Sequence, residues 1–345
     1  MVTIFKLRRY QKALIFIVFA AFAMIGCPQF FPPKTVDYVD IERYTGLWYQ
    51  IAGYYNPAEG DLAAVTAEYT LLDDGTVKVL NKALIGDLDG TPVSIEGIAR
   101  VVDPVTNAKL AVRFTNPEVP DREFEYWIID LGQYYSYAVV SNSTRSVLYI
   151  LSRTPTMEEL TYQNLIDRLT IDGFDPDKIV ITLQNNEMPP PETVAFVDLE
   201  SYAGLWYEIA RYDTPFDEDA VAVKAEYTLN EDGTVKVVNS GLVGGLDGTP
   251  TSIEGVARVV DPETNAKLAV TFDRPDIEGI EFAYWIIELD EDYQYAVVTN
   301  DTRFVLYILS RTPTMEDSVY EDILYRVVKK GFNADKVELT PQQEE

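Results

Sequence analysis

The stretch YTGLWYQIAGYY, residues 44–55, returns almost unchanged as YAGLWYEIARYD, residues 202–213. The tryptophans of the two stretches, Trp48 and Trp206, are 158 positions apart, and the same offset aligns the rest of the chain without a gap. A self-match at so long a period indicates a duplicated domain, large enough in each copy to bury its own core, rather than a solenoid of short repeats. The chain is therefore expected to contain two copies of one fold.

The segment between the two copies predicts how they are joined. Residues 184–193, QNNEMPPPET, contain three consecutive prolines, which favour an extended polyproline II conformation. We expect a first domain over residues 36–183 and a second over residues 194–345, joined by this short, semi-rigid linker. The two domains would then be neighbours in space, able to pack on each other.

The first residues have the features of a lipoprotein signal. A basic start is followed by an apolar run over residues 13–26, shorter than the ~20 residues that a membrane-spanning helix needs. The run ends in MIGC, which resembles a bacterial lipobox in which the cysteine, Cys27, becomes acylated. We expect residues 1–26 to be a signal peptide and residues 27–35 to be a lipid-anchored tether; an uncleaved signal anchor is the alternative. Pro28, in place of a retention aspartate, implies the outer membrane.

The composition excludes several kinds of function. The chain has 56 acidic and 28 basic residues and a net charge of −28, so it repels nucleic acids and anionic membrane surfaces. Membrane contact is expected only through acylated Cys27. The chain has no histidine and no second cysteine, which removes the usual zinc and haem sites and every nucleophile that depends on them. We therefore expect a protein that is not an enzyme and that has no metal, no cofactor and no nucleic-acid partner.

Each copy is a series of short segments in which apolar and polar residues alternate between turns. Val223, Ala225 and Tyr227 alternate with polar residues, which is typical of a half-buried strand. In the first copy the pattern predicts eight strands, at residues 47–55, 63–71, 76–83, 93–102, 108–115, 123–131, 135–141 and 146–153. Eight antiparallel strands can close into an up-and-down barrel that holds one small ligand.

A helix and a short strand are expected after each barrel. In the first copy Thr156 and Glu159 have the spacing of a capping box, and Gly173-Phe174 predicts the end of the helix. Residues 179–183 would form the last strand. The predicted fold is thus all-β, with two eight-stranded antiparallel barrels, each followed by a C-terminal α-helix and a short strand.

The motifs of both copies resemble those of the lipocalins. GLWY at residues 46–49 and 204–207 is similar to the first lipocalin signature. LSRTPT at residues 151–156 and 309–314 is similar to the late-strand arginine and helix start of bacterial outer-membrane lipocalins. The resemblance covers each copy from end to end and implies that the arginine lies across the tryptophan indole at the closed end of the barrel. The implied structural signature is Gly46, Trp48 and Arg153 in the first copy and Gly204, Trp206 and Arg311 in the second.

The resemblance also implies an apolar interior, and alternation along the strands nominates residues that face it. The candidate ligand contacts are Tyr69, Asn81, Tyr137 and Tyr149 in the first copy and Val223, Tyr227, Val237, Asn239, Tyr295 and Tyr307 in the second. The asparagines are candidate headgroup contacts, but a buried amide that bonds strand backbone is an equal alternative. The tyrosines either bind a headgroup oxygen or fill the core. In strand six the inward face is either that of Phe124 and Tyr126 or that of Glu125 and Trp127.

The leading hypothesis is a lipid-anchored lipoprotein that binds, stores or transports small amphiphilic lipids, such as fatty acids or lysophospholipids, at the periplasmic face of the outer membrane. The alternative is a structural or interaction lipoprotein whose barrels are filled by their own tyrosines. The first copy has Gly53 where the second has Arg211, and only the second matches the family pattern there. We therefore expect ligand binding more strongly for the second copy.

Overall fold

The structure is a computed structural model that describes residues 31–55, 61–116, 119–212, 214 and 220–343. The expected signal peptide, Cys27 and the first part of the tether lie outside these residues. Within the described ranges, no helix has the length and apolar character needed to cross a membrane.

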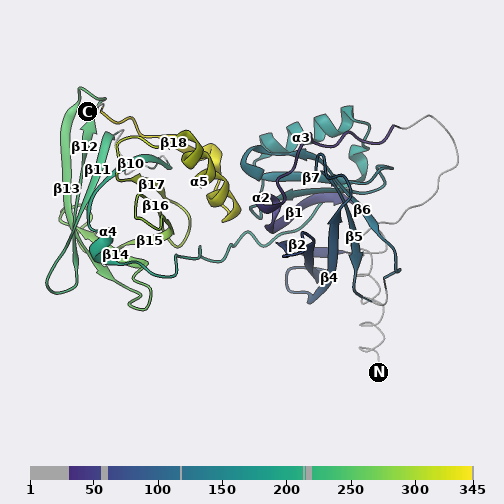
Figure 1. Cartoon of the computed structure of the whole chain (residues 1–345), viewed down its shortest axis with the longest axis horizontal. Coiled ribbons are helices and arrows are strands. Elements are labelled where there is room, and N and C mark those ends of the chain that lie inside the picture. The colour runs from purple at the N-terminus through teal and green to yellow at the C-terminus, as the bar shows by residue number, and fades with distance from the viewer. Residues whose placement is uncertain (1–30, 56–60, 117–118, 213, 215–219, 344–345) are drawn as a thin grey trace. The chain divides into compact units, whose positions relative to one another are not determined.

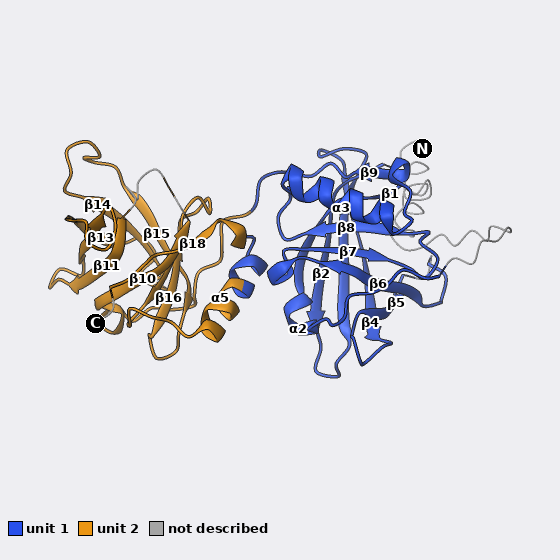
Figure 2. Cartoon of the chain, turned by 90° about the horizontal axis from the view of Figure 1, so that it is seen from above, with its two compact units in different colours: residues 1–188, 325–332 blue, residues 189–324, 333–345 orange. Residues whose placement is uncertain are grey.

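The chain divides into two compact units (Figure 2). One unit comprises residues 1–188 together with 325–332, and the other comprises residues 189–324 together with 333–345. Each unit contains one of the two barrels.

The first unit is built around a closed β-barrel (Figure 1). Its strands are β1 (Gly46–Tyr54), β2 (Leu62–Leu71), β3 (Val77–Ile85), β4 (Thr91–Val101), β5 (Lys109–Phe114), β6 (Phe124–Leu131), β7 (Tyr137–Ser141) and β8 (Leu148–Ser152). Neighbours in the sequence pair antiparallel from β2 to β8, and β1 pairs with both β8 and β2, which closes the sheet. The eight-stranded antiparallel barrel expected from the sequence is confirmed.

Helices and a ninth strand complete the first unit. These are α2 (Ile41–Tyr44), the 3₁₀ turns η2 (Gln133–Tyr135) and η3 (Pro176–Lys178), α3 (Glu159–Ile171) and β9 (Ile179–Ile181). Strand β9 pairs antiparallel with the second half of β1, at Ala52, Gly53 and Tyr54. The predicted helix and last strand are thus present, in the predicted order.

The second copy of the fold repeats this plan. Its elements are α4 (Leu199–Tyr202), β10 (Gly204–Tyr212), β11 (Ala220–Leu229), β12 (Val235–Val243), β13 (Thr249–Val259), β14 (Lys267–Phe272), β15 (Phe282–Leu289), β16 (Tyr295–Thr299), β17 (Leu306–Ser310), α5 (Asp317–Lys329), η4 (Ala334–Lys336) and β18 (Val337–Leu339). Strand β10 pairs with both β17 and β11, so this barrel is closed in the same way.

The alternation of residues along the strands sorts them between the barrel interior and its outer surface. On β3, Val77 and Val79 belong to the buried core, whereas Lys78 reaches Glu96 on the outer face. Strand β8 is apolar on both faces, because Leu151 faces the interior and Ile150 packs outside against Leu165 of α3. Helix α3 thus covers one side of the barrel, and the strands beneath it are buried on two faces.

The helix α3 ends as predicted but begins differently. Gly173 has a positive φ of 85°, and the Phe174 amide donates 2.9 Å to the Leu169 carbonyl, as in a glycine-terminated helix. The predicted capping box is wrong: the helix begins at Glu159, and its cap residue Glu158 makes no side-chain capping bond. The Thr156 carbonyl instead accepts a hydrogen bond from the Thr154 hydroxyl, in the preceding loop.

Candidate functional site

The closed end of the first barrel is built around Trp48 and Arg153. The guanidinium carbon of Arg153 lies 3.7 Å from the centre of the Trp48 ring, the arrangement implied by the lipocalin resemblance. The Trp48 Nε1–H donates 2.9 Å to the Tyr44 carbonyl, and Arg153 donates to the carbonyls of Arg43, Tyr44 and Leu47. These bonds hold α2 across the bottom of the barrel.

The charge of Arg153 is buried at this floor. Burial lowers the pKa of its guanidinium to about 9, and the neighbouring tyrosines partly offset this shift. The side chain therefore remains protonated at neutral pH, and its donors are satisfied by backbone carbonyls. In the second barrel, Arg311 lies 3.8 Å from the Trp206 ring centre, and Trp206 donates 2.8 Å to the Tyr202 carbonyl.

Three tyrosine hydroxyls meet directly above this floor in each barrel. In the first barrel the Tyr126 hydroxyl lies 2.7 Å from that of Tyr44 and 3.0 Å from that of Tyr69. Burial raises the pKa of Tyr69 to about 12 and raises those of Tyr44 and Tyr126 well above their usual value. The three phenols thus stay protonated and satisfy one another. We call this group the tyrosine triad; its equivalent in the second barrel is Tyr202, Tyr284 and Tyr227, with hydroxyl distances of 2.7 and 3.0 Å.

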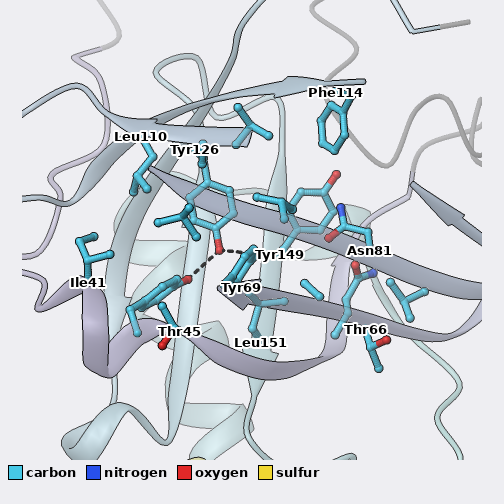
Figure 3. A pocket seen from close by; sticks show the side chains of 18 residues that line it. Ile41, Thr45, Thr66, Tyr69, Asn81, Leu110, Phe114, Tyr126, Tyr149 and Leu151 are labelled. Atoms are coloured by element: carbon cyan, nitrogen blue, oxygen red, sulfur yellow. Dashed lines mark hydrogen bonds between the residues drawn. The ribbon is translucent and has the colours of Figure 1, made fainter. Parts of the chain in front are cut away.

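A cavity extends from the triad into the first barrel (Figure 3). Its empty volume, including the part open to solvent, is about 790 Å³, and the equivalent cavity of the second barrel has about 470 Å³. The first barrel therefore has more open space, whereas the sequence favoured ligand binding in the second. None of the described residues that line either cavity carries a charge. Mostly apolar cavities with a few polar groups are typical of small-molecule sites.

Most of the predicted contact residues line these cavities. Tyr69, Asn81 and Tyr149 line the first cavity, where Figure 3 shows Asn81 and Tyr149 pointing into a part of it away from the triad. Tyr227, Val237 and Asn239 line the second cavity. Val223 and Tyr307 are not among the residues that line the second cavity, although their counterparts Val65 and Tyr149 line the first.

The prediction that Tyr137 and Tyr295 face the interior is wrong. Ala138 pairs with Leu151 and shares its inward face, so Tyr137 points outward, where it accepts 3.0 Å from Arg168 of α3. Ala296 pairs with Leu309 in the same way, which turns Tyr295 outward. The sequence could not show which face of β7 is inside, because the strand is apolar on both faces: one faces the barrel interior and the other packs under α3.

Strand β6 supplies a site residue that the sequence left undecided. Tyr126 lines the cavity, whereas Trp127 lies outside, with the Lys109 ammonium 4.4 Å from its ring centre. Tyr44 was also not foreseen, because it lies in the short helix before β1. The recurrence of tyrosine at both positions in the second copy, Tyr202 and Tyr284, is the sequence signal that could have indicated the triad.

The cavity asparagines have an unsatisfied acceptor. Among the described residues, the buried Oδ1 atoms of Asn81 and Asn239 receive no hydrogen bond. The alternative that these amide oxygens bond strand backbone therefore does not describe them. Because an unpaired buried polar atom costs about 1–3 kcal/mol, each cavity holds an acceptor that a donor group on a ligand would satisfy.

Comparison with known proteins agrees with this architecture. The family profile described as "Lipocalin-like domain" matches residues 39–184 and 197–342. Temperature-induced lipocalin-1 from Arabidopsis thaliana is 38% identical over 158 residues, which are 44% of this chain and 83% of that protein. Outer membrane lipoprotein Blc from Escherichia coli (strain K12) is 38% identical over 150 residues, 43% of this chain and 82% of that protein. Apolipoprotein D from Bos taurus is 33% identical over 175 residues, 48% of this chain and 86% of that protein.

Proposed function

Because the chain belongs to the family of lipocalin-like domains, with one such domain in each half, we propose that it binds small amphiphilic lipids, such as fatty acids or lysophospholipids, inside its barrels. The observation that carries the proposal is the uncharged cavity above the tyrosine triad in each barrel. An acyl chain lies against the valine and leucine side chains of the wall. The headgroup finds its hydrogen-bond partners among the few polar groups, of which the asparagine is one.

Burial of the acyl chain provides most of the affinity. Burying apolar surface contributes about 25 cal/mol per Å², or about 0.8 kcal/mol per methylene group. Because the net charge is −28, the protein does not attract a fatty acid at long range. The described residues that line the cavities carry no charge that could pair with its carboxylate. Affinity therefore increases with chain length and depends only weakly on salt.

We further propose that the protein works at the bacterial cell envelope as a lipoprotein of the outer membrane, anchored through acylated Cys27 and facing the periplasm. Two observations support this location: the MIGC sequence after the apolar run, and the similarity to proteins named outer membrane lipoprotein Blc. There it stores or carries lipids and is not an enzyme, consistent with a chain that lacks histidine.

Lipid binding is tested on the full mature chain. Native mass spectrometry of the purified protein, followed by lipid extraction, identifies any bound lipid, and the delipidated protein is then titrated with fluorescent fatty acids of increasing chain length. The double variant Val79→Trp, Val237→Trp fills both cavities and should abolish binding. Val256→Trp, at an exposed position of β13, is the control and should bind normally. A folded, delipidated protein that binds none of these lipids would favour the alternative of an interaction lipoprotein.

A further inference from the structure

The two cavities differ along one wall. The residues that line the second cavity all have counterparts, at the 158-residue offset, among those that line the first. Six further residues line only the first cavity: Gln50, Val65, Thr66, Ala67, Tyr149 and Leu151. They lie on β1, β2 and β8, which are neighbours in the sheet. The additional space of the first barrel therefore lies along this wall.

Residue 53 belongs to the same wall. Gly53 on β1 pairs with Tyr149 on β8. A Cβ atom placed on Gly53 would lie 3.3 Å from the Tyr149 ring and 3.5 Å from Gln50 Nε2. A long side chain at position 53 would therefore extend over both residues and separate them from the cavity.

The second barrel has such a side chain at this place. Arg211 pairs with Tyr307, as Gly53 pairs with Tyr149. A β-bulge between Glu208 and Ala210 shifts the register, so Glu208 and Arg211 both share the inward face although they are three residues apart. Arg211 is 12% exposed, and its Nη1 donates 2.7 Å to Glu208 Oε1 and 3.0 Å to the Ala220 carbonyl.

This arginine is held firmly in the second barrel. Glu208 Oε1 also accepts 2.7 Å from the Thr340 hydroxyl, so the ion pair belongs to a larger buried network. Breaking one partner of a buried, hydrogen-bonded ion pair is strongly unfavourable, so a lipid would not easily displace Arg211. In the first barrel the neutral Gln50 donates 2.9 Å to the Thr182 hydroxyl and needs no arginine beside it.

We propose that the residue at position 53 or 211 decides how long an acyl chain each cavity accepts, so that the first barrel binds longer-chain amphiphiles than the second. This inference rests on the proposed function and adds that the two barrels accept acyl chains of different length. Gly53 leaves the wall of β1, β2 and β8 open to the chain, whereas Arg211, with Glu208, fills that space. One protein thus offers two cavities of different length.

The experiment separates the two cavities within the full chain. Val237→Trp fills the second cavity and leaves the first to be measured, and Val79→Trp does the reverse. Each variant is titrated by calorimetry with linear primary alcohols of increasing chain length. In both, affinity should first rise roughly fourfold per added methylene, the value expected for full burial. The Val79→Trp chain should then reach a plateau at a shorter alcohol than the Val237→Trp chain.

Exchanging the residues at positions 50 and 53 with those at positions 208 and 211 should exchange the chain lengths that the two cavities accept. In the Val79→Trp chain, Glu208→Gln with Arg211→Gly recreates the first barrel's residues without leaving a lone charge, and should move the plateau to longer alcohols. In the Val237→Trp chain, Gln50→Glu with Gly53→Arg should move the plateau to shorter alcohols. A Cβ at Gly53 approaches the Leu148 carbonyl to 2.7 Å, so circular dichroism must first show that this second variant folds.

The outcomes distinguish the inference from the proposed function. The inferred difference between the barrels is overturned if affinity stops rising at the same alcohol length in both single variants. It is also overturned if Glu208→Gln with Arg211→Gly leaves that length unchanged. Lipid binding itself would stand in either case. If neither single variant binds any alcohol, and the unmodified chain binds none either, the proposed function fails and the inference fails with it.

Discussion

The guanidinium carbon of Arg153 lies over the indole of Trp48, 3.7 Å from the ring centre, at the end of the first barrel. Arg153 directly follows β8 and Trp48 lies near the start of β1, so the contact fastens the last strand of the barrel to the first. The same arginine bonds the carbonyls of α2, which makes the short helix part of the floor. These contacts close this end of the barrel, so the interior above them does not need to be filled with side chains and can hold a cavity.

Removing the floor tryptophan should unfold its barrel more easily. Trp206 is fully buried, so Trp206→Ala is expected to cost about 3–5 kcal/mol of unfolding free energy, through lost burial and the cavity left behind. Urea unfolding of the full chain should show a destabilised second barrel and an unchanged first. Trp285→Ala is the matched control: Trp285 contacts Lys267 on the outer face and should cost less. Equal losses for the two variants would contradict the assigned floor.

Breaking the tyrosine triad should cost stability through unpaired hydroxyls. In Tyr126→Phe the hydroxyls of Tyr44 and Tyr69 lose their common partner inside the core, so we expect a loss of about 1–3 kcal/mol. Tyr137→Phe, which removes an outer hydroxyl bonded to Arg168, is the control and should cost less than 1 kcal/mol. Chemical denaturation measures both variants, and a triad variant as stable as the control would show that the three hydroxyls do not depend on one another.

The triad should also make the protein sensitive to alkaline pH. Burial raises the pKa of Tyr69 from 10.0 to about 12, so folding favours the protonated phenol. Stability from this group is complete below about pH 10 and is lost as the pH rises through about 12. Spectrophotometric titration of tyrosine should show that Tyr69→Phe removes phenolate absorbance that develops near pH 12. A variant that instead loses absorbance near pH 10 would mean that Tyr69 is accessible to water.

The cavity asparagine should be unfavourable for stability and favourable for binding. Asn81→Leu removes a buried oxygen that receives no hydrogen bond, so the empty protein should gain about 1 kcal/mol of stability. The same change should lower the affinity for a long-chain alcohol about tenfold, because the alcohol hydroxyl can donate to Asn81. The affinity for the corresponding methyl ether should stay the same. Thermal melting and calorimetric titration of the Val237→Trp chain measure the two effects. A loss of stability, or equal losses for the alcohol and the ether, would remove Asn81 from the site.

The lipid anchor should depend on Cys27 alone. Because Cys27 is the only cysteine and directly follows the apolar run, Cys27→Ala should prevent acylation and move the protein out of the membrane fraction. Fractionation of cells that express each form, with metabolic labelling by a fatty acid, measures this. A Cys27→Ala protein that still fractionates fully with the membrane would refute the proposed anchor.

The amino-acid sequence by itself determined the duplication and the order of the strands, and its resemblance to the lipocalins implied the contact between Trp48 and Arg153. The duplication follows from the self-match at 158 residues, the strands from a period of two along each segment, and the resemblance from the motifs GLWY and LSRTPT. Such patterns show which residues share a face of a strand. They show which face is inside only where the other face is polar, as on β3, where Val79 and Lys78 alternate.

Only the tertiary structure decided the rest. Both faces of β7 are apolar: Ala138 belongs to the core inside the barrel, and Val139 packs outside it with residues of α3. The outward position of Tyr137 therefore required the register with β8. The inward position of Arg211 required a β-bulge that alternation cannot reveal. The unequal cavities and the tyrosine triad arise from side chains on several strands that meet across the barrel, and which of them meet is set by strand pairing and closure, not by neighbours in the sequence.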